Sequence, residues 1–347
     1  MLDKIKFKIN AFFYGLPNIP NEIVIELTDR CNLNCSFCFN KLYTQPGSRG
    51  GGLDTALVKT IIDKIKRAKV PIVRFTGGEP LLRNDTFELM DYASQQGLRV
   101  WLNTNATLID RKIAVKIARY VENVLIPLNA HNSEFERTLT GENAFKRKLK
   151  GAVLLKESGI QYLRCGTVAT RCNIANLEKI YSLVKRLKII DWELFRVIPS
   201  SHEEIPVDNN DIALLVEKLI SINAKENTNY KIANALPFCA YDPEKIKKVA
   251  LGAHFDDGHT RFVVNVKGDA VPMYYISEKI GNILRDDVLP IWNNRFMKNM
   301  RLLHYVPNVC KRCKYIRTCK GGSRATAKIV KGQYDEIDYL AQPYRAY

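Results

Sequence analysis

The chain has 347 residues, of which 46% are hydrophobic and 26% are charged, as in an ordinary globular protein long enough for two domains. The sequence contains no run of about 18 apolar residues, so no transmembrane helix is predicted. Residues 1–17 lack the apolar core and cleavage site of a signal peptide. The net charge of +17 suits either an anionic partner or lysines spread over solvated helix faces.

Between residues 22 and 199, short β-branched segments alternate with longer amphipathic segments. Strands are predicted at 22–27, 70–77, 98–105, 121–129, 160–170 and 191–199, and helices at 55–68, 85–97, 111–120, 145–159 and 176–187. This βα spacing predicts a parallel sheet with right-handed crossovers. Six units are too few for a closed eight-stranded barrel, so we expect an α/β fold with a partial (β/α)6 TIM-type barrel.

The pattern changes after Pro199. A polar linker is followed by a predicted helix at 211–224, a β-hairpin with strands at 260–266 and 270–276, and a helical segment at 287–303. We therefore expect an N-terminal extension (1–20), the barrel (21–205), a linker helix (206–234) and a small α+β domain with a β-hairpin (235–347).

The nine cysteines are unevenly distributed, because six of them form two tight groups along the chain. Disulfide scaffolds are usually small and secreted, whereas grouped cysteines in a larger chain without a signal peptide indicate metal ligands. Such thiolates need a reducing compartment, so we expect a cytoplasmic protein.

The first group, Cys31, Cys35 and Cys38, follows the first predicted strand at the spacing C-x3-C-x2-C. Three cysteine ligands on a [4Fe–4S] cluster leave one iron open for chemistry, although three cysteines alone could also bind zinc. A second motif lies at the end of the second predicted strand, where Gly77, Gly78 and Glu79 precede a proline. The carboxyl ends of parallel strands form the ligand side of such sheets, and glycines there allow close approach of the backbone to a ligand.

Together these two motifs resemble the radical S-adenosylmethionine (SAM) superfamily over about residues 21–200. The resemblance implies that Cys31, Cys35 and Cys38 bind a [4Fe–4S] cluster whose open iron holds SAM. One electron then cleaves SAM to methionine and a 5′-deoxyadenosyl radical, which abstracts a substrate hydrogen. The resemblance also implies that the Gly77–Glu79 turn meets the methionine amino group of SAM and that Phe39 lies near its adenine.

Other barrel positions follow from the same resemblance. The candidates for contacts with SAM are Asn103 and Asn105 on the third strand, Asn129 on the fourth and Arg137 after it. Many relatives carry a serine and an aspartate on the fourth strand, where this chain has Pro127 and Asn129. A guanidinium group binds a carboxylate in a bidentate manner, so Arg137 suits the SAM carboxylate, although a surface role fits it equally well.

Three further residues of the barrel are not assigned to the SAM site. Arg196 on the sixth strand either faces the substrate or has a structural role. Cys165 and Cys172 are interpreted as small buried core residues.

The second cysteine group, Cys310, Cys313 and Cys319, has the spacing C-x2-C-x5-C. It resembles the SPASM or twitch extension of radical SAM enzymes, which carries auxiliary iron–sulfur clusters. The chain departs from the fuller pattern, because Met273 and Ser323 occupy usual cysteine positions and the tail lacks the last cysteine.

The resemblance therefore implies at most one auxiliary [4Fe–4S] cluster in this extension. Cys239 is the first candidate for its fourth ligand, and the weaker candidates are Asp335, Asp338, His254 and His259. A structural zinc ion on the four cysteines is the alternative.

The expected function is a radical SAM enzyme that oxidises or cross-links a peptide or protein side chain, with an electron donor such as flavodoxin or ferredoxin. Oxidation or rearrangement of an anionic small molecule is the second hypothesis, and a non-catalytic iron–sulfur or zinc protein is the third. The basic stretch at 310–331 could attract an acidic peptide. Nucleic acid is not expected as a partner, because no basic strand carries interleaved aromatic residues.

Overall fold

The computed structural model describes residues 17–39, 51–199, 207–256, 258–276 and 278–343. Parts of the expected N-terminal extension (1–16) and of the expected barrel segment (200–205) lie outside these residues. The described strands form one sheet in the order β10-β9-β8-β1-β2-β3-β4-β5-β6-β7. The strands are β1 (Glu22–Glu26), β2 (Ile72–Thr76), β3 (Arg99–Asn103), β4 (Asn123–Pro127), β5 (Tyr162–Ala169), β6 (Asp191–Arg196), β7 (Lys231–Ile232), β8 (Arg261–Val264), β9 (Asp269–Val271) and β10 (Gly281–Asn282).

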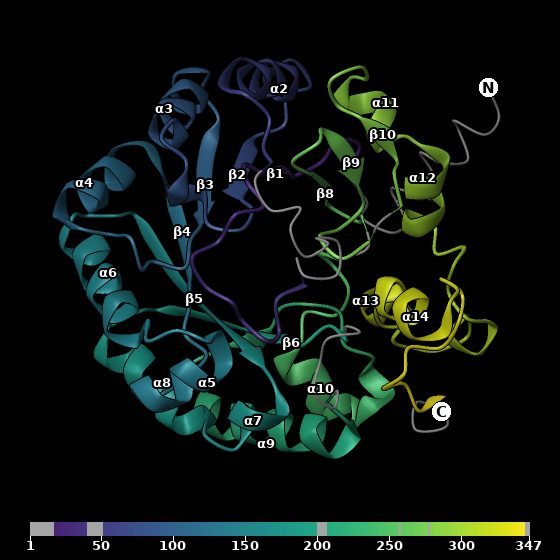
Figure 1. The fold of residues 1–347 in the computed structure, drawn as a ribbon. Coiled ribbons are helices and arrows are strands. Elements are labelled where there is room, and N and C mark those ends of the chain that lie inside the picture. The colour runs from purple at the N-terminus through teal and green to yellow at the C-terminus, as the bar shows by residue number, and fades with distance from the viewer. Residues whose placement is uncertain (1–16, 40–50, 200–206, 257, 277, 344–347) are drawn as a thin grey trace.

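Helices cover the outside of this curved sheet, as the view along the barrel shows (Figure 1). In the barrel they are α2 (Thr55–Arg67), α3 (Thr86–Gln95), α4 (Arg111–Tyr120), α5 (Ser133–Thr140), α6 (Phe145–Glu157), α7 (Arg171–Ile174) and α8 (Leu177–Arg186). After the barrel come α9 (Asn209–Glu226), α10 (Pro243–Val249), α11 (Val288–Trp292), α12 (Arg295–Arg301), α13 (Ile316–Cys319) and α14 (Arg324–Lys331). Short 3₁₀ turns are η2 (Pro80–Leu82), η3 (Phe238–Ala240) and η4 (Asn308–Cys310).

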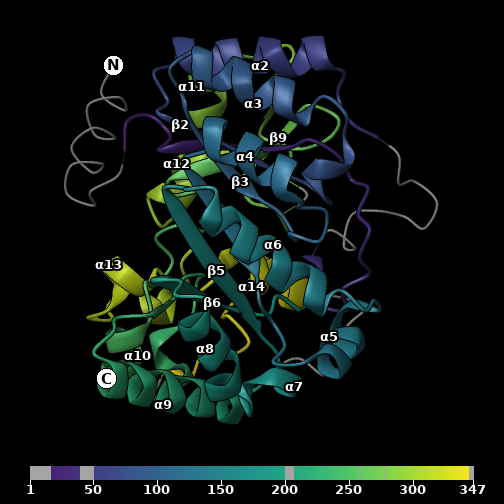
Figure 2. The ribbon, with the colours of Figure 1, turned by 90° about the vertical axis from the view of Figure 1, so that its left-hand side faces the viewer.

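The predicted partial barrel is confirmed, because β1 to β6 pair in parallel and in chain order. Alternate residues of a strand point to opposite faces. Ile23 and Ile25 are fully buried in the core that also contains Ile61 and Ile65 of α2, whereas Glu22 and Glu26 lie on the opposite face. When the molecule is turned, α2, α3, α4 and α6 are seen on the outer side of the sheet (Figure 2).

The predicted C-terminal hairpin is also confirmed, since β8 and β9 pair antiparallel with Val263 opposite Val271. Its place in the fold was not foreseen. β8 pairs in parallel with β1, with Ile23 opposite Phe262, so the hairpin extends the barrel sheet across the expected domain boundary. On the other edge, β7 adds a seventh parallel strand beside β6; two residues are too few to be recognised from sequence.

Two helical predictions need correction. The single segment expected at 287–303 is two helices, because the Asn294 side chain accepts a hydrogen bond from the Phe296 amide and so begins α12 as a new helix. Helix α5, which the sequence analysis missed, begins at the cap residue Asn132 and ends at Gly141 with φ of 70°. None of the described helices combines the length and the apolar character that a membrane span requires.

Candidate active site and the two cysteine groups

The loop that carries Cys31, Cys35 and Cys38 leaves the C-terminal end of β1 and is anchored to α5. The Asn34 amide donates a hydrogen bond to the Thr140 carbonyl oxygen (3.0 Å), and the Ser36 amide donates to the Leu139 carbonyl oxygen (2.9 Å). The unpredicted helix α5 therefore fixes the middle of the cysteine loop.

The same loop is joined to the glycine turn after β2. The Gly78 amide donates to the Thr28 carbonyl oxygen (2.6 Å), and the Glu79 amide donates to that of Arg30 (2.7 Å). A Cβ atom at Gly77 would lie 2.2 Å from the Thr28 oxygen, and one at Gly78 would lie 2.0 Å from the Arg30 oxygen. The glycines were expected to let a ligand approach; in the structure they let the cysteine loop itself approach.

Glu79 connects this turn to the end of β3. Its carboxylate is fully buried and accepts hydrogen bonds from the Thr104 hydroxyl (2.7 Å), the Asn105 amide (2.7 Å) and the Leu81 amide (3.1 Å). Burial raises the pKa of Glu79, and these hydrogen bonds oppose the rise. The role of Thr104 was missed, because nothing in the sequence distinguishes it from the two flanking asparagines.

The three thiols of the loop are half-buried. Burial raises the pKa of Cys35 to about 12 and also raises the pKa of Cys31. The Asn105 side chain donates to the Cys31 sulfur (3.8 Å) and to the Asn32 side chain (2.8 Å). Coordination by a metal deprotonates a thiol outright, so three half-buried thiols on one short loop fit the donor set of an iron–sulfur cluster.

The remaining barrel candidates lie in different surroundings. Asn103 accepts a hydrogen bond from Arg74 (3.1 Å), and buried Asn129 accepts one from the Val168 amide (2.8 Å), which ties β4 to β5. Arg137 is exposed on α5. Phe39 packs against Tyr274, with ring centroids 5.1 Å apart.

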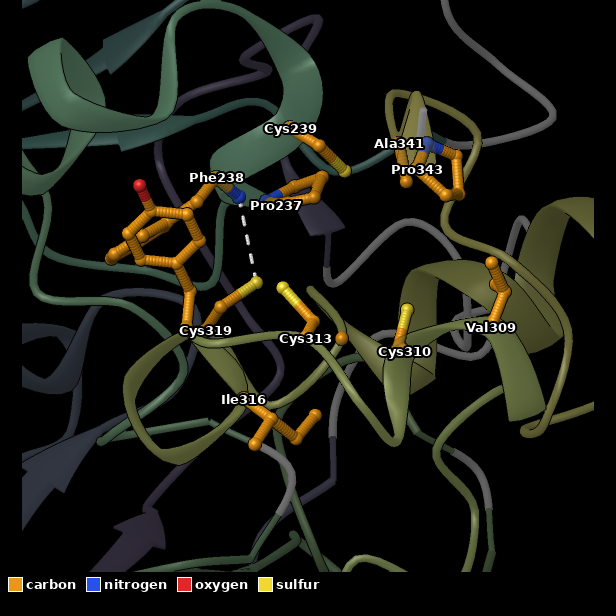
Figure 3. Close-up of a pocket in the computed structure, with 12 residues that line it drawn as sticks. Pro237, Phe238, Cys239, Val309, Cys310, Cys313, Ile316, Cys319, Ala341 and Pro343 are labelled. Atoms are coloured by element: carbon orange, nitrogen blue, oxygen red, sulfur yellow. Dashed lines mark hydrogen bonds between the residues drawn. The ribbon is translucent and has the colours of Figure 1, made fainter. Parts of the chain in front are cut away.

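The second cysteine group has the fourth thiol that the sequence suggested. Cys239 of η3 lines one pocket together with Cys310, Cys313 and Cys319, and the four thiols point into the space between η3 and the C-terminal segment (Figure 3). Burial raises the pKa of Cys239 to about 12 and that of Cys310 to about 11. The Phe238 amide donates to the Cys319 sulfur (3.4 Å). This donor set also fits an iron–sulfur cluster.

The same four thiols also suit the zinc alternative. Four cysteine sulfurs at about 2.3 Å from the metal make a common structural zinc site, so counting the iron and zinc atoms per chain distinguishes a zinc ion from a cluster.

The positions that depart from the full cysteine pattern have structural roles. Buried Ser323 accepts a hydrogen bond from the Thr326 amide (3.1 Å) and so begins α14. Met273 is buried with Ile198 and Ala325. Asp338, one of the weaker ligand candidates, is instead fully buried in an ion pair with Arg196.

The structure also shows the surroundings of the remaining residues that the sequence singled out. His259 is buried, and its Nδ1 atom lies 2.6 Å from the Asp256 carbonyl oxygen. Cys165 is buried in the core as expected, but Cys172 is exposed at the start of α7, so its interpretation as a core residue was wrong. Of the basic residues at 310–331, Lys320 and Arg324 are buried and do not contribute to a charged surface.

Comparison with known proteins agrees with this geometry. The radical SAM superfamily model matches residues 25–187, and the model of the SPASM iron–sulfur cluster-binding domain matches residues 257–314. The AdoMet-dependent heme synthase of Methanosarcina barkeri is 27% identical over 351 residues, which cover 96% of this chain and 98% of that protein.

Two further proteins are also similar. The mycofactocin maturase MftC of Mycobacterium tuberculosis is 33% identical over 181 residues, 51% of this chain and 45% of that protein. The crystal structure of Streptococcus suis SuiB bound to its precursor peptide SuiA shares the fold, with a TM-score of 0.77 at 19% identity over 98% of this chain and 80% of SuiB.

The two family matches identify an enzyme of the radical SAM class with an iron–sulfur domain. The chain belongs to the radical SAM superfamily and carries a SPASM iron–sulfur domain.

Proposed function

We propose that Cys31, Cys35 and Cys38 hold the [4Fe–4S] cluster that binds SAM. The observation that carries this proposal is the direct hydrogen bonding of the cysteine loop to the glycine turn through the Gly78 and Glu79 amides. When bound, the cluster and SAM supply a 5′-deoxyadenosyl radical that takes a hydrogen atom from the substrate.

The protein's own residues position these groups. Glu79 fixes the end of β3 through Thr104 and the Asn105 amide, which leaves the turn backbone as the partner for the methionine amino group of SAM. Asn105 orients the Cys31 thiol. Phe39 and Tyr274 provide an aromatic surface for the adenine, and exposed Arg137 is free to turn toward the SAM carboxylate. Asn103 and Asn129 act indirectly, by holding Arg74 and the edge of β5.

The SPASM region holds one auxiliary [4Fe–4S] cluster on Cys239, Cys310, Cys313 and Cys319. The common pocket of these four thiols supports this assignment. Both clusters require reduced thiols and a low-potential electron donor such as flavodoxin or ferredoxin, which is consistent with a cytoplasmic enzyme.

An anionic small molecule is the substrate class best supported, with a carboxylate-bearing iron porphyrin as the first candidate. The heme synthase similarity extends over nearly the whole of both chains, whereas the maturase similarity covers about half of this chain. The net charge of +17 suits substrate carboxylates. A peptide side chain is the second candidate, because the fold is that of SuiB bound to its precursor peptide.

The test is hydrogen abstraction from each substrate class by the reconstituted, reduced protein. We expect an iron porphyrin to increase the yield of 5′-deoxyadenosine and to change in mass. If deuterium from a labelled peptide, and none from a labelled porphyrin, enters 5′-deoxyadenosine, the small-molecule assignment fails and the peptide assignment replaces it.

A further inference from the structure

The second cysteine group lies close to the surface of the protein. Cys310 and Cys313 are half-buried, and exposed Val309 beside them lines the pocket that the four thiols share (Figure 3). Electrons pass between proteins only over short distances. A redox centre in this pocket therefore exchanges electrons with a partner that docks against this side of the molecule.

Exposed cations flank this pocket and form what we call the basic surface. They come from the segment that carries the cysteines and from α10, and they are Lys247, Lys248, Lys311, Arg312 and Arg317. Within the described ranges of the chain, ion pairs involve the neighbouring Lys245 and Lys314 but none of these five cations. Asp242 and Glu244 at the start of α10 offset only part of this charge.

Direct contacts join the two halves of the basic surface. The Tyr315 hydroxyl donates a hydrogen bond to the Glu244 carboxylate (2.5 Å), and the Lys314 ammonium lies 3.8 Å from the same carboxylate. Lys247 and Lys248 follow Glu244 by three and four residues and so lie on its face of α10. Figures 1 and 2 both show α10 beside α13. The five cations therefore belong to one continuous surface.

We propose that the basic surface docks a small one-electron carrier protein with an acidic surface, of the flavodoxin or ferredoxin class, which exchanges electrons with the auxiliary cluster. This inference rests on the proposed function. The oxidised carrier accepts one electron from the reduced cluster, which returns to its oxidised state. Opposite charges steer such encounters and raise the association rate. A substrate peptide has no comparable reason to bind here, because it must reach the Cys31–Cys38 loop beyond the end of β1.

The test measures how an oxidised flavodoxin binds to the anaerobically reconstituted full chain, by calorimetry at low and high salt. Stopped-flow absorbance then follows reduction of the flavin by the dithionite-reduced chain, after the dithionite has been removed. We expect Lys247→Glu/Lys248→Glu/Arg317→Glu to raise the Kd by about tenfold or more at low salt and to slow flavin reduction. The difference from the wild type should shrink at high salt, because salt screens exposed charges.

The matched control is Lys112→Glu/Lys116→Glu/Arg119→Glu, which reverses three exposed cations on α4 and makes the same change in net charge. We expect this control to bind flavodoxin as the wild type does. The neutral variant Lys247→Gln/Lys248→Gln/Arg317→Gln, for which we expect a smaller rise in Kd, remains informative if charge reversal disturbs the fold.

The possible failures are distinguishable. Equal effects of the α10–α13 and α4 charge reversals, or no flavodoxin complex with the wild type, overturn this inference alone. Weaker binding of a poly-glutamate peptide with unchanged flavodoxin binding assigns the basic surface to an acidic peptide and also overturns it. Iron and zinc analysis of the same preparations tests the proposed function, because about four irons and one zinc per chain remove the auxiliary cluster and this inference with it.

Discussion

Arg196 and Asp338 form a fully buried ion pair, with Nη2 and Oδ2 2.7 Å apart, that fastens the C-terminal segment to the last long strand of the barrel. The Asp338 carboxylate also accepts the Ser323 amide (2.9 Å) at the start of α14. The Asp338 carboxylate thus joins β6 to the turn that follows Cys319. This contact is a structural coupling between the barrel and the second cysteine group.

Asp338→Asn should destabilise the protein strongly, because it leaves the Arg196 guanidinium buried without its counter-ion. Loss of one partner from a buried pair costs about 3–5 kcal/mol. Anaerobic urea unfolding followed by circular dichroism measures this cost. The control is Glu157→Gln at the exposed pair with Arg111, where we expect a change of about 0–1 kcal/mol. Equal costs for the two variants would contradict the coupling.

Gly77→Ala should displace the cysteine loop, because the added Cβ atom would lie 2.2 Å from the Thr28 carbonyl oxygen. The matched control is Gly97→Ala, which also has a positive φ but no atom within 4 Å of the added Cβ. Both variants carry backbone strain of about 1 kcal/mol or more, but only Gly77→Ala should lose iron from the SAM site. Iron and sulfide analysis after reconstitution decides this, and full iron occupancy in Gly77→Ala would refute the steric argument.

Cys239→Ser should reduce the iron content from about eight atoms per chain toward about four, because two [4Fe–4S] clusters are expected and one loses a ligand. The control is Cys172→Ser, which changes an exposed cysteine and should leave iron content unchanged. Four irons and one zinc in the wild type would show that the second cysteine group is a zinc site.

Glu26 should make stability depend on pH near neutrality. Burial, and then the negative charge of Asp29, raise the pKa of Glu26 from 4.5 to about 7. The folded state therefore favours the protonated carboxyl. The destabilisation from its ionisation is absent below about pH 4.5 and fully present above about pH 7.

Glu26→Gln removes this ionisation. The melting temperature of the wild type should therefore fall relative to that of Glu26→Gln as the pH rises from about 5 to about 8. Parallel melting curves over that range would show that Glu26 titrates at its ordinary pKa.

The barrel could be predicted from sequence because its signals are local and repeated. The β-branched runs that became β1 to β6 alternate with amphipathic helices, and each of the two cysteine groups occupies a short stretch of chain. The pairing of β8 with β1 could not be predicted, because it joins residues more than 200 positions apart and no local pattern encodes such a contact.

The candidate sites show the same limit. Cys239 could be predicted as the fourth ligand because cysteine is a common metal ligand and is rare elsewhere in this region. In the structure it lines the same pocket as Cys319. Thr104 and Lys148 were missed because threonine and lysine are common on loops and helices. Both are buried, Thr104 against the Glu79 carboxylate and Lys148 in an ion pair with Glu136, and only the tertiary structure reveals this.

Reductive cleavage of SAM by the reconstituted wild type and by Cys35→Ala tests the central claim most directly. The wild type, reduced anaerobically, should convert SAM to 5′-deoxyadenosine and methionine, and Cys35→Ala should not, because the cluster then lacks one of its three protein ligands. Equal 5′-deoxyadenosine formation by the two proteins would contradict the assignment of the Cys31–Cys38 loop as the SAM-cleaving site.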